Sequence, residues 1–344
     1  MAKSNNNGNA RLKSLTASKL FPLLILYIAM IIIFTVWSRL VGANFLQIST
    51  VKNILQSLVI SAFLTMGAGT LLIAGHLDLA QSSIGAFGGI VLAWLVAKDV
   101  NWILAIIIAM AICALFGILS AVMITKFHFP SFIATLAMAS IVKGFMYIYS
   151  SLGTDNGLAT NVYFKNDALN YLGNGKILGV PFSVILAIVF FVIYGIIIAK
   201  TSFGAKIMLM GGNPVAATLA GINASALLFI LFINSALTGC VAGILNSARL
   251  QQGALLALGT AQFTGITAAV LGGISFGGGS GGMGGAFLGL LILNTFQIGM
   301  SVVGLNPFWV NVFSGILLLL ALAFDFISTT RKAKVPVVIK EEEK

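Results

Sequence analysis

Residues 100–125 read VNWILAIIIAMAICALFGILSAVMIT, a run without a charged side chain. At a rise of about 1.5 Å per residue, a helix of this length crosses a bilayer core about 30 Å thick. The whole chain is similar in character: 59% of its 344 residues are hydrophobic, 8% are charged, and the mean hydropathy is +1.07. Soluble domains carry roughly 25% charged residues, so a soluble enzyme, a DNA-binding protein and a disulfide scaffold are excluded. The composition predicts an all-α, polytopic membrane protein.

Charged residues divide the chain into apolar segments long enough to span a bilayer. Two further cuts divide the charge-free region 250–324: a segment at 272–285 with nine glycines in fourteen positions, and a Gly-Leu-Asn-Pro turn at 304–307. So many glycines do not suit an ordinary helix interior, and a proline opens a helix readily. The resulting count is about ten transmembrane helices, at 20–38, 53–75, 79–97, 100–125, 131–150, 177–199, 226–248, 252–271, 284–303 and 308–327.

The distribution of lysine and arginine predicts that both termini are cytoplasmic. With ten spans, twelve of the 19 basic residues fall in segments on the side of the termini and six fall on the other side. The positive-inside rule assigns the richer side to the cytoplasm. The predicted organisation is a cytoplasmic tail over 1–19, a transmembrane domain over 20–328 and a cytoplasmic tail over 329–344. The net charge of +11 then indicates contact with anionic lipid rather than nucleic acid.

A short helix is predicted between the sixth and seventh spans. Residues 201–223 read TSFGAKIMLMGGNPVAATLAGIN. Asn213 is a good N-cap, Pro214 a good first helical residue, and Gly221 can end the helix. Two interpretations stay open: a mere connector, or a helix that docks on a partner protein. Docking is favoured by the small side chains that this helix would present, namely those of Ala216, Ala217 and Ala220.

Two ionisable residues within apolar segments are candidates for a translocation pathway. Asp78 either caps the third span, with Gln81 completing a capping box, or lines a water-filled path, and these roles are compatible. Lys143 lies about twelve residues into the fifth span, too deep for comfortable snorkelling. It is expected to face the bundle interior or the outer vestibule.

The glycine-rich segment 272–285 is a further candidate, represented by Gly272, Gly273 and Ser275. Its glycines either allow helices to approach closely or form irregular backbone that lines a cavity. The segment resembles the region that begins at Gly75, which suggests a weak internal repeat. Interrupted helices at matching positions of a transporter point to its pathway.

Several absences narrow the function. The chain has no Gly-x-x-x-x-Gly-Lys-Ser/Thr loop for ATP and no catalytic constellation of side chains. It has two histidines without an accompanying ligand set, and Cys113 and Cys240 lie in apolar runs, where packing is their expected role. The sequence therefore predicts no catalytic, cofactor or metal site on this chain.

Four motifs resemble those of the ribose-type permease subunits of ATP-binding-cassette (ABC) importers, a group that also serves galactose, xylose, inositol and autoinducer-2. The resemblance covers roughly residues 20–328. The family's Gly-Gly-Ile-Asp-Leu-Ser is similar to residues 75–80, its Gly-Gly-Asn-x-x-Ala-Ala-x-x-x-Gly-Ile matches 211–222, and its Ala-Ala-Val-Leu-Gly-Gly-Ile-Ser fits 268–275. Its Pro-x-Phe-Ile-x-Thr-Leu, followed by a basic residue and glycine, matches Pro130, Phe132, Ile133, Thr135, Leu136, Lys143 and Gly144.

The resemblance implies a permease subunit that is not itself an enzyme and that sits in the bacterial plasma membrane. Two permease chains, identical or related, would surround one pathway for a monosaccharide. A cytoplasmic ABC ATPase would drive transport, and an extracytoplasmic binding protein would deliver the sugar. The segment 201–225 would be the coupling segment that contacts the ATPase, through Gly212, Asn213, Pro214, Ala216, Ala217 and Gly221.

The sequence also departs from the family pattern and leaves alternatives open. Gln262, Phe263 and Thr264 stand where the family often has Glu-Leu-Asp, and Ala205 stands where it often has arginine. The expected substrate is therefore not restricted to ribose. A permease for branched-chain amino acids or nucleosides is one alternative. An ion-coupled secondary transporter is another, although the membrane segments offer few ion-coupling groups besides Asp78 and Lys143.

Overall fold

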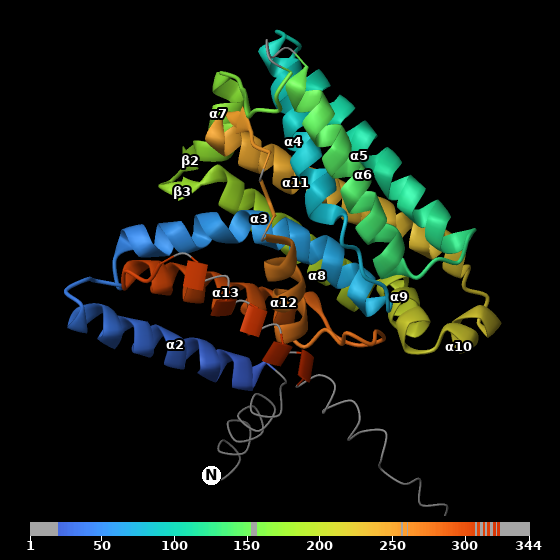
Figure 1. The fold of residues 1–344 in the computed structure, drawn as a ribbon. Helices are drawn as coiled ribbons and strands as arrows, with labels where there is room; N and C mark the ends of the chain where they lie inside the picture. The colour runs from blue at the N-terminus through green and yellow to red at the C-terminus, as the bar shows by residue number, and fades with distance from the viewer. Residues whose placement is uncertain are drawn as a thin grey trace, which may run out of the picture.

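The structure is a computed structural model that describes residues 20–152, 157–255, 257–259, 261–306, 308–309, 312–313, 315–316, 319–320 and 322–323 (Figure 1). Within these residues, seven helices are long and apolar enough to cross a membrane. They are α2 (Phe21–Leu40), α3 (Ile48–Ile73), α5 (Trp102–Thr125), α6 (Ser131–Ser151), α8 (Phe182–Lys200), α11 (Ala224–Leu250) and α13 (Met283–Val302).

Two shorter apolar helices, α4 (Gln81–Ala97) and α12 (Ala261–Leu271), correspond to the predicted third and eighth spans. Nine of the ten predicted spans thus have a helical counterpart, and the polytopic helical fold is confirmed. Half of the residues of the tenth predicted span, 308–327, lie outside the described residues.

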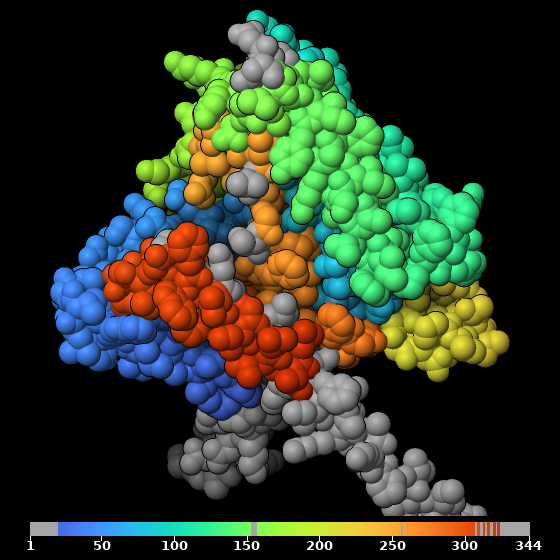
Figure 2. All heavy atoms as spheres, viewed as in Figure 1, coloured from blue at the N-terminus to red at the C-terminus, as the bar shows by residue number. Residues whose placement is uncertain are grey.

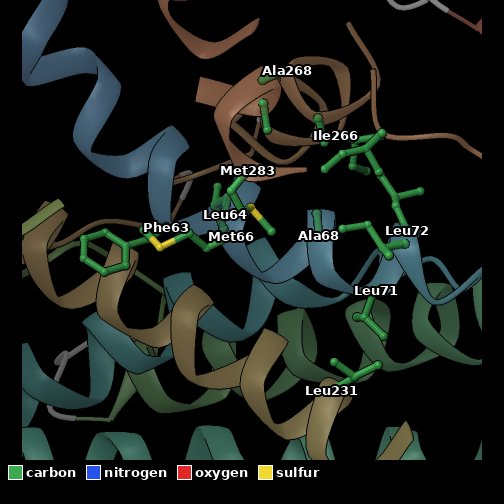
Figure 3. Packing of buried hydrophobic residues seen from close by; sticks show 14 of the residues in the cluster. Phe63, Leu64, Met66, Ala68, Leu71, Leu72, Leu231, Ile266, Ala268 and Met283 are labelled. Carbon is green, nitrogen blue, oxygen red and sulfur yellow. The ribbon is translucent and has the colours of Figure 1, made fainter. Parts of the chain in front are cut away.

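Helices α3 and α11 form the centre of the molecule. Helices α4 and α5 pack against α11, while α8, α12 and α13 pack against α3. Figure 3 shows side chains of α3 and of the helices around it, including Phe63, Leu72, Leu231 and Ile266. The outer helices α2, α5, α6 and α8 instead expose large apolar side chains, such as Ile107 of α5. An exposed apolar surface of this extent suits contact with lipid rather than water.

Glycines let α4 and α11 pack backbone to backbone. A Cβ atom on Gly243 would overlap the carbonyl of Gly85, and one on Gly85 would overlap the carbonyl of Gly239. In lipid, van der Waals packing rather than hydrophobic burial drives the association of helices. Small residues favour this packing because they let two helix backbones approach closely.

The predicted start of the eighth span at residue 252 is wrong. Gln251 ends α11 in a left-handed conformation, with φ of 53°. The chain then forms strand β4 (Gln252–Gly253), which pairs antiparallel with β1 (Val162–Tyr163). Helix α12 begins only at residue 261, and the start of the predicted span forms strand β4 instead. Periodicity alone does not distinguish a short apolar strand from a segment of buried helix.

The connecting segments gather at opposite ends of the bundle (Figure 1). At one end lie helix α7 (Asp167–Asn174) and a hairpin of strands β2 (Lys176–Ile177) and β3 (Val180–Pro181). At the other end lie α9 (Ser202–Gly212) and α10 (Pro214–Leu219). The sequence predicted α10 but neither α7 nor α9, both of which begin at a side-chain cap, Asn166 and Thr201 respectively.

Candidate functional site

The chain is not helical between α3 and α4, and side chains from elsewhere stabilise this break. The backbone turns at Gly75, where φ is +77°. The N–H of Leu77 donates to Ser131 Oγ at 3.3 Å, and the N–H of Leu79 donates to Thr135 Oγ1 at 3.0 Å. Backbone groups without helical partners need such bonds when they are buried. The first turns of α6 therefore hold the α3–α4 break.

Asp78 lies in this break and is 2% exposed. Its Oδ1 accepts a hydrogen bond from the N–H of Ala80 at 2.8 Å, and its Oδ2 accepts one from Ser235 Oγ of α11 at 2.7 Å. The predicted capping box is wrong, because the Gln81 side chain instead donates to Thr238 Oγ1 at 3.1 Å. The carboxylate thus binds the backbone immediately before α4, whose N-cap is Ala80, and ties this segment to α11.

Gln262, in the first turn of α12, connects the same break to a third helix. Its Nε2 donates to the carbonyl oxygen of Asp78 at 2.9 Å, and its Oε1 accepts from the N–H of Ser82 at 2.8 Å. The amide uses both a donor and an acceptor here. An ionised carboxylate at this position could not donate to the carbonyl of Asp78.

A cavity of about 270 Å³ opens beside the break, between α4, α6 and α12. In Figure 2 the orange surface of the α12 region lies beside the blue surface of α4 and the green surface of α6. Lys143 is the only charged side chain among the described lining residues, and Gln262 and three hydroxyl-bearing residues line the same cavity. The lining residues are Leu79, Ser82, Ser83, Ala86, Leu136, Ala139, Lys143, Met146, Tyr147, Leu255, Ala257, Gly259, Gln262 and Phe263.

Of the predicted pathway residues, the structure brings only Lys143 to this cavity. Asp78 is not among the lining residues, which argues against the hypothesis that its side chain faces a water-filled path. Gly272 supports the packing interpretation, because a Cβ atom there would overlap Gly285 of α13. Gly273 turns with φ of +88°, Ser275 is 9% exposed, and neither lines the cavity.

Helix α10 has the predicted caps. Asn213 Oδ1 accepts from the N–H of Ala216 at 3.0 Å, Pro214 is the first helical residue, and Gly221 follows the helix with φ of +76°. The predicted partner contact through Ala217 is wrong, because Ala217 is 0% exposed and packs in the main core.

Two larger apolar side chains, rather than the alanines, form the exposed apolar surface of α10. Val215 is 70% exposed and Leu219 is 85% exposed. These two residues, four apart, lie on the same side of a helix. We call the surface formed by Val215 and Leu219 the docking face of α10.

Sequence reasoning missed Ser131, Thr135, Ser235 and Gln262 as structural partners of the break. Their polarity within apolar segments was the available signal, but nothing local indicated what they would bond. Among the described residues, no group of three or more His, Cys, Asp or Glu is arranged to hold a metal ion. Cys113 and Cys240 are free thiols and both are buried.

Comparison with known proteins relates the chain to transport subunits. The family described as "Branched-chain amino acid transport system / permease component" matches residues 44–322. The chain is 31% identical over 307 residues to the ribose import permease protein RbsC of Bacillus subtilis (strain 168), which covers 89% of this chain and 92% of that protein. It is 30% identical over 282 residues to the L-arabinose ABC transporter permease protein AraH of Azospirillum brasilense, which covers 82% and 81%. No solved structure matches the chain.

Proposed function

This chain belongs to the family of branched-chain amino acid transport system permease components, and on that premise we propose that it imports a monosaccharide or a similar small polar solute. It is a multi-pass membrane protein and the transport component of an ABC importer, so ATP hydrolysis belongs to a partner. Membership in the family implies an ATPase and a solute-binding protein as partners. The sugar itself is inferred from the ribose and arabinose permeases that the chain is similar to.

The docking face of α10 is the observation that carries the proposal. A helix of six residues is too short to span a membrane, yet its Val215 and Leu219 are 70% and 85% exposed. Exposed apolar side chains at the end of a bundle, beyond its lipid-facing surface, favour a protein partner. We assign the ATPase to this face, and Gly212, Asn213, Pro214, Ala216 and Gly221 to the shape of the corner that presents it.

The cavity beside α6 is the proposed position of the solute. Its volume of about 270 Å³ lies just below the roughly 300–1,000 Å³ typical of ligand pockets. Lys143 and the hydroxyls of Ser82 and Ser83 supply hydrogen bonds suited to the oxygen atoms of a sugar. A monosaccharide is the class of solute that this lining fits.

A second permease chain is the proposed cover of the cavity. One wall is the surface of α6, where Leu136 is 54% exposed and Lys143 is also exposed. A lysine that faced lipid here would be costly. A second copy, or a related chain, would enclose Lys143 in a polar pathway between the two subunits.

The α9–α10 end is proposed to be cytoplasmic, with both termini, and the α7 end to be extracytoplasmic. This orientation follows from the excess of lysine and arginine in the segments on the side of the termini. It directs the docking face towards the ATPase and the α7 end towards the binding protein.

Reconstitution tests the function directly. The chain is placed in proteoliposomes with its partner ABC ATPase and solute-binding protein, and ATP-dependent uptake of labelled ribose, arabinose, leucine and uridine is compared. Sugar uptake that needs ATP and the binding protein supports the proposal. Uptake of leucine or uridine alone would assign another substrate class, and uptake driven by an ion gradient without ATP would contradict an ABC importer.

Paired variants test the docking face. We expect Val215→Ser with Leu219→Ser to abolish co-purification of the ATPase, because both side chains are exposed and neither supports the core. The control is Leu178→Ser, at the tip of the β2–β3 hairpin, where the side chain is 100% exposed at the other end of the molecule. Retention of the ATPase by the double variant would overturn the assignment of this face.

A further inference from the structure

Three segments that are distant in sequence meet backbone to backbone beside α10. They are the α3–α4 break at Gly75, the end of α9 at Gly211 and Gly212, and the α12–α13 loop at Gly278 and Gly279. We call this meeting point the glycine junction. No side chain of these five residues separates the three segments.

The contacts within the glycine junction are short. The N–H of Gly279 donates to the carbonyl oxygen of Ile73 at 2.8 Å, across the end of α3. A Cβ atom on Gly278 would lie 2.8 Å from Gly75 Cα and 2.9 Å from the carbonyl oxygen of Gly211. A Cβ atom on Gly279 would lie 2.7 Å from the N atom of Gly212.

Glycine is required at this point for two reasons. Gly75, Gly278 and Gly279 have φ of +77°, +86° and +74°, a region that other L-residues rarely adopt. Gly211 has ordinary helical geometry, but a Cβ atom there would overlap the Ile73 carbonyl and lie 2.6 Å from the N atom of Gly279. A side chain at Gly211 would therefore separate the segments that the hydrogen bond joins.

The three segments lead to different parts of the machinery. The Gly211–Gly212 segment continues directly into α10 and its docking face. The break at Gly75 continues into α4, whose first turn supplies Ser82 to the cavity, and the α12–α13 loop continues back into α12, whose first turn supplies Gln262. The junction thus lies between the docking face and two walls of the cavity.

A close-packed junction transmits displacement well. Close-packed protein interiors have low compressibility, because they contain little empty space that could absorb a shift. A flexible side chain between two segments could change its rotamer instead of moving its neighbour. Direct backbone contact removes that freedom.

We propose that the glycine junction is the coupling contact that carries movement of α9 and α10 to the α3–α4 break and the α12–α13 loop, and so to the α4 and α12 walls of the cavity. Gly211 and Gly279 act in it as positioning residues. This inference rests on the proposed function, since it takes α10 to be the ATPase contact. It assigns to the glycine-rich loop 272–282 a role in energy coupling rather than in contact with the solute.

Gly211→Ala tests the junction in the complete transporter with its ATPase and binding protein. The ATPase should still co-purify, because the docking face is unchanged. Sugar uptake per ATP hydrolysed should fall by roughly tenfold, within the range of measured couplings between sites. The matched control is Gly284→Ala in the first turn of α13, where a Cβ atom would meet nothing within 4 Å and uptake per ATP should not change.

Two readouts separate the possible failures. If Gly211→Ala keeps the wild-type ratio of uptake to ATP hydrolysis, the junction does not couple the two processes. If the unmodified permease, with its wild-type docking face, does not bind the ATPase, the proposed function is refuted instead. Hydrogen–deuterium exchange of the peptide 272–282 in the unmodified transporter covers the case in which the variant does not fold. Exchange there should differ between the nucleotide-free and ATP-bound states, and identical exchange would overturn the proposal.

Discussion

At the residue scale, Asp78 shows how an acid inside an apolar region can be structural. Both carboxylate oxygens accept hydrogen bonds, one from the backbone of Ala80 and one from Ser235. These bonds join an interrupted helix to a helix far along the chain. The hydrogen-bonding shape of the side chain matters here more than access to a solute.

Asp78→Asn should keep near-normal uptake, because the amide can accept from Ala80 and donate to Ser235. Asp78→Ala should destabilise the protein by about 1–3 kcal/mol, the usual cost of leaving buried polar groups unpaired. Thermal unfolding in detergent and uptake in proteoliposomes measure the two effects. A stable Asn variant that transports no sugar would show that the negative charge itself is needed.

Lys143, unlike the buried Asp78, is exposed and lines the cavity. Lys143→Met should leave folding intact and lower uptake, because the methionine fills a similar space without a hydrogen-bond donor. Lys143→Arg should restore most of the uptake. Equal uptake by the Met variant and the wild type would remove Lys143 from the proposed pathway.

At the element scale, helix pairs in this protein are specified by glycine. The contact between α4 and α11 depends on Gly85, Gly239 and Gly243, where added Cβ atoms would overlap backbone atoms. Helix α11 also carries Ser235, which bonds Asp78 in the α3–α4 break. Separation of α4 from α11 would therefore disturb this bond as well.

Gly243→Ala should therefore lower stability by about 1–3 kcal/mol through overpacking. Gly195→Ala in α8 is the matched control, because its Cβ atom would make an ordinary contact of 3.8 Å with Met283. Thermal unfolding of the two purified variants checks the difference. Similar stability for both would mean that α4 and α11 can separate without cost.

At the scale of the whole molecule, the proposed orientation can be tested with single cysteines. Native Cys113 and Cys240 are 0% exposed and should not react with an impermeant thiol reagent. Leu158→Cys, at a site 63% exposed, should be labelled from outside the cell, and Leu219→Cys, at a site 85% exposed, should be labelled only after the membrane is opened. The reverse pattern would invert the topology.

Much of the fold follows from local properties of the sequence. A run of apolar residues long enough to cross a bilayer is recognisable by itself, which is why nine predicted spans have helical counterparts. The caps of α10 were also predictable, because Asn213 bonds the backbone three residues away. The start of α12 was not, because the strand that replaces it depends on pairing with Val162 and Tyr163, far along the chain.

The candidate site depended on tertiary structure for a physical reason. Whether a side chain faces the core, a cavity or a partner is decided by which distant segments pack around it. Ala217 is turned inward while Val215 and Leu219 are exposed, although all three belong to one short helix. The sequence alone determined the class of the protein, the presence of nine of its apolar helices and the short capped helix α10. Tertiary packing alone decided that Asp78 bonds Ser235, 157 residues away, that Lys143 reaches a cavity, and that glycines of three segments meet.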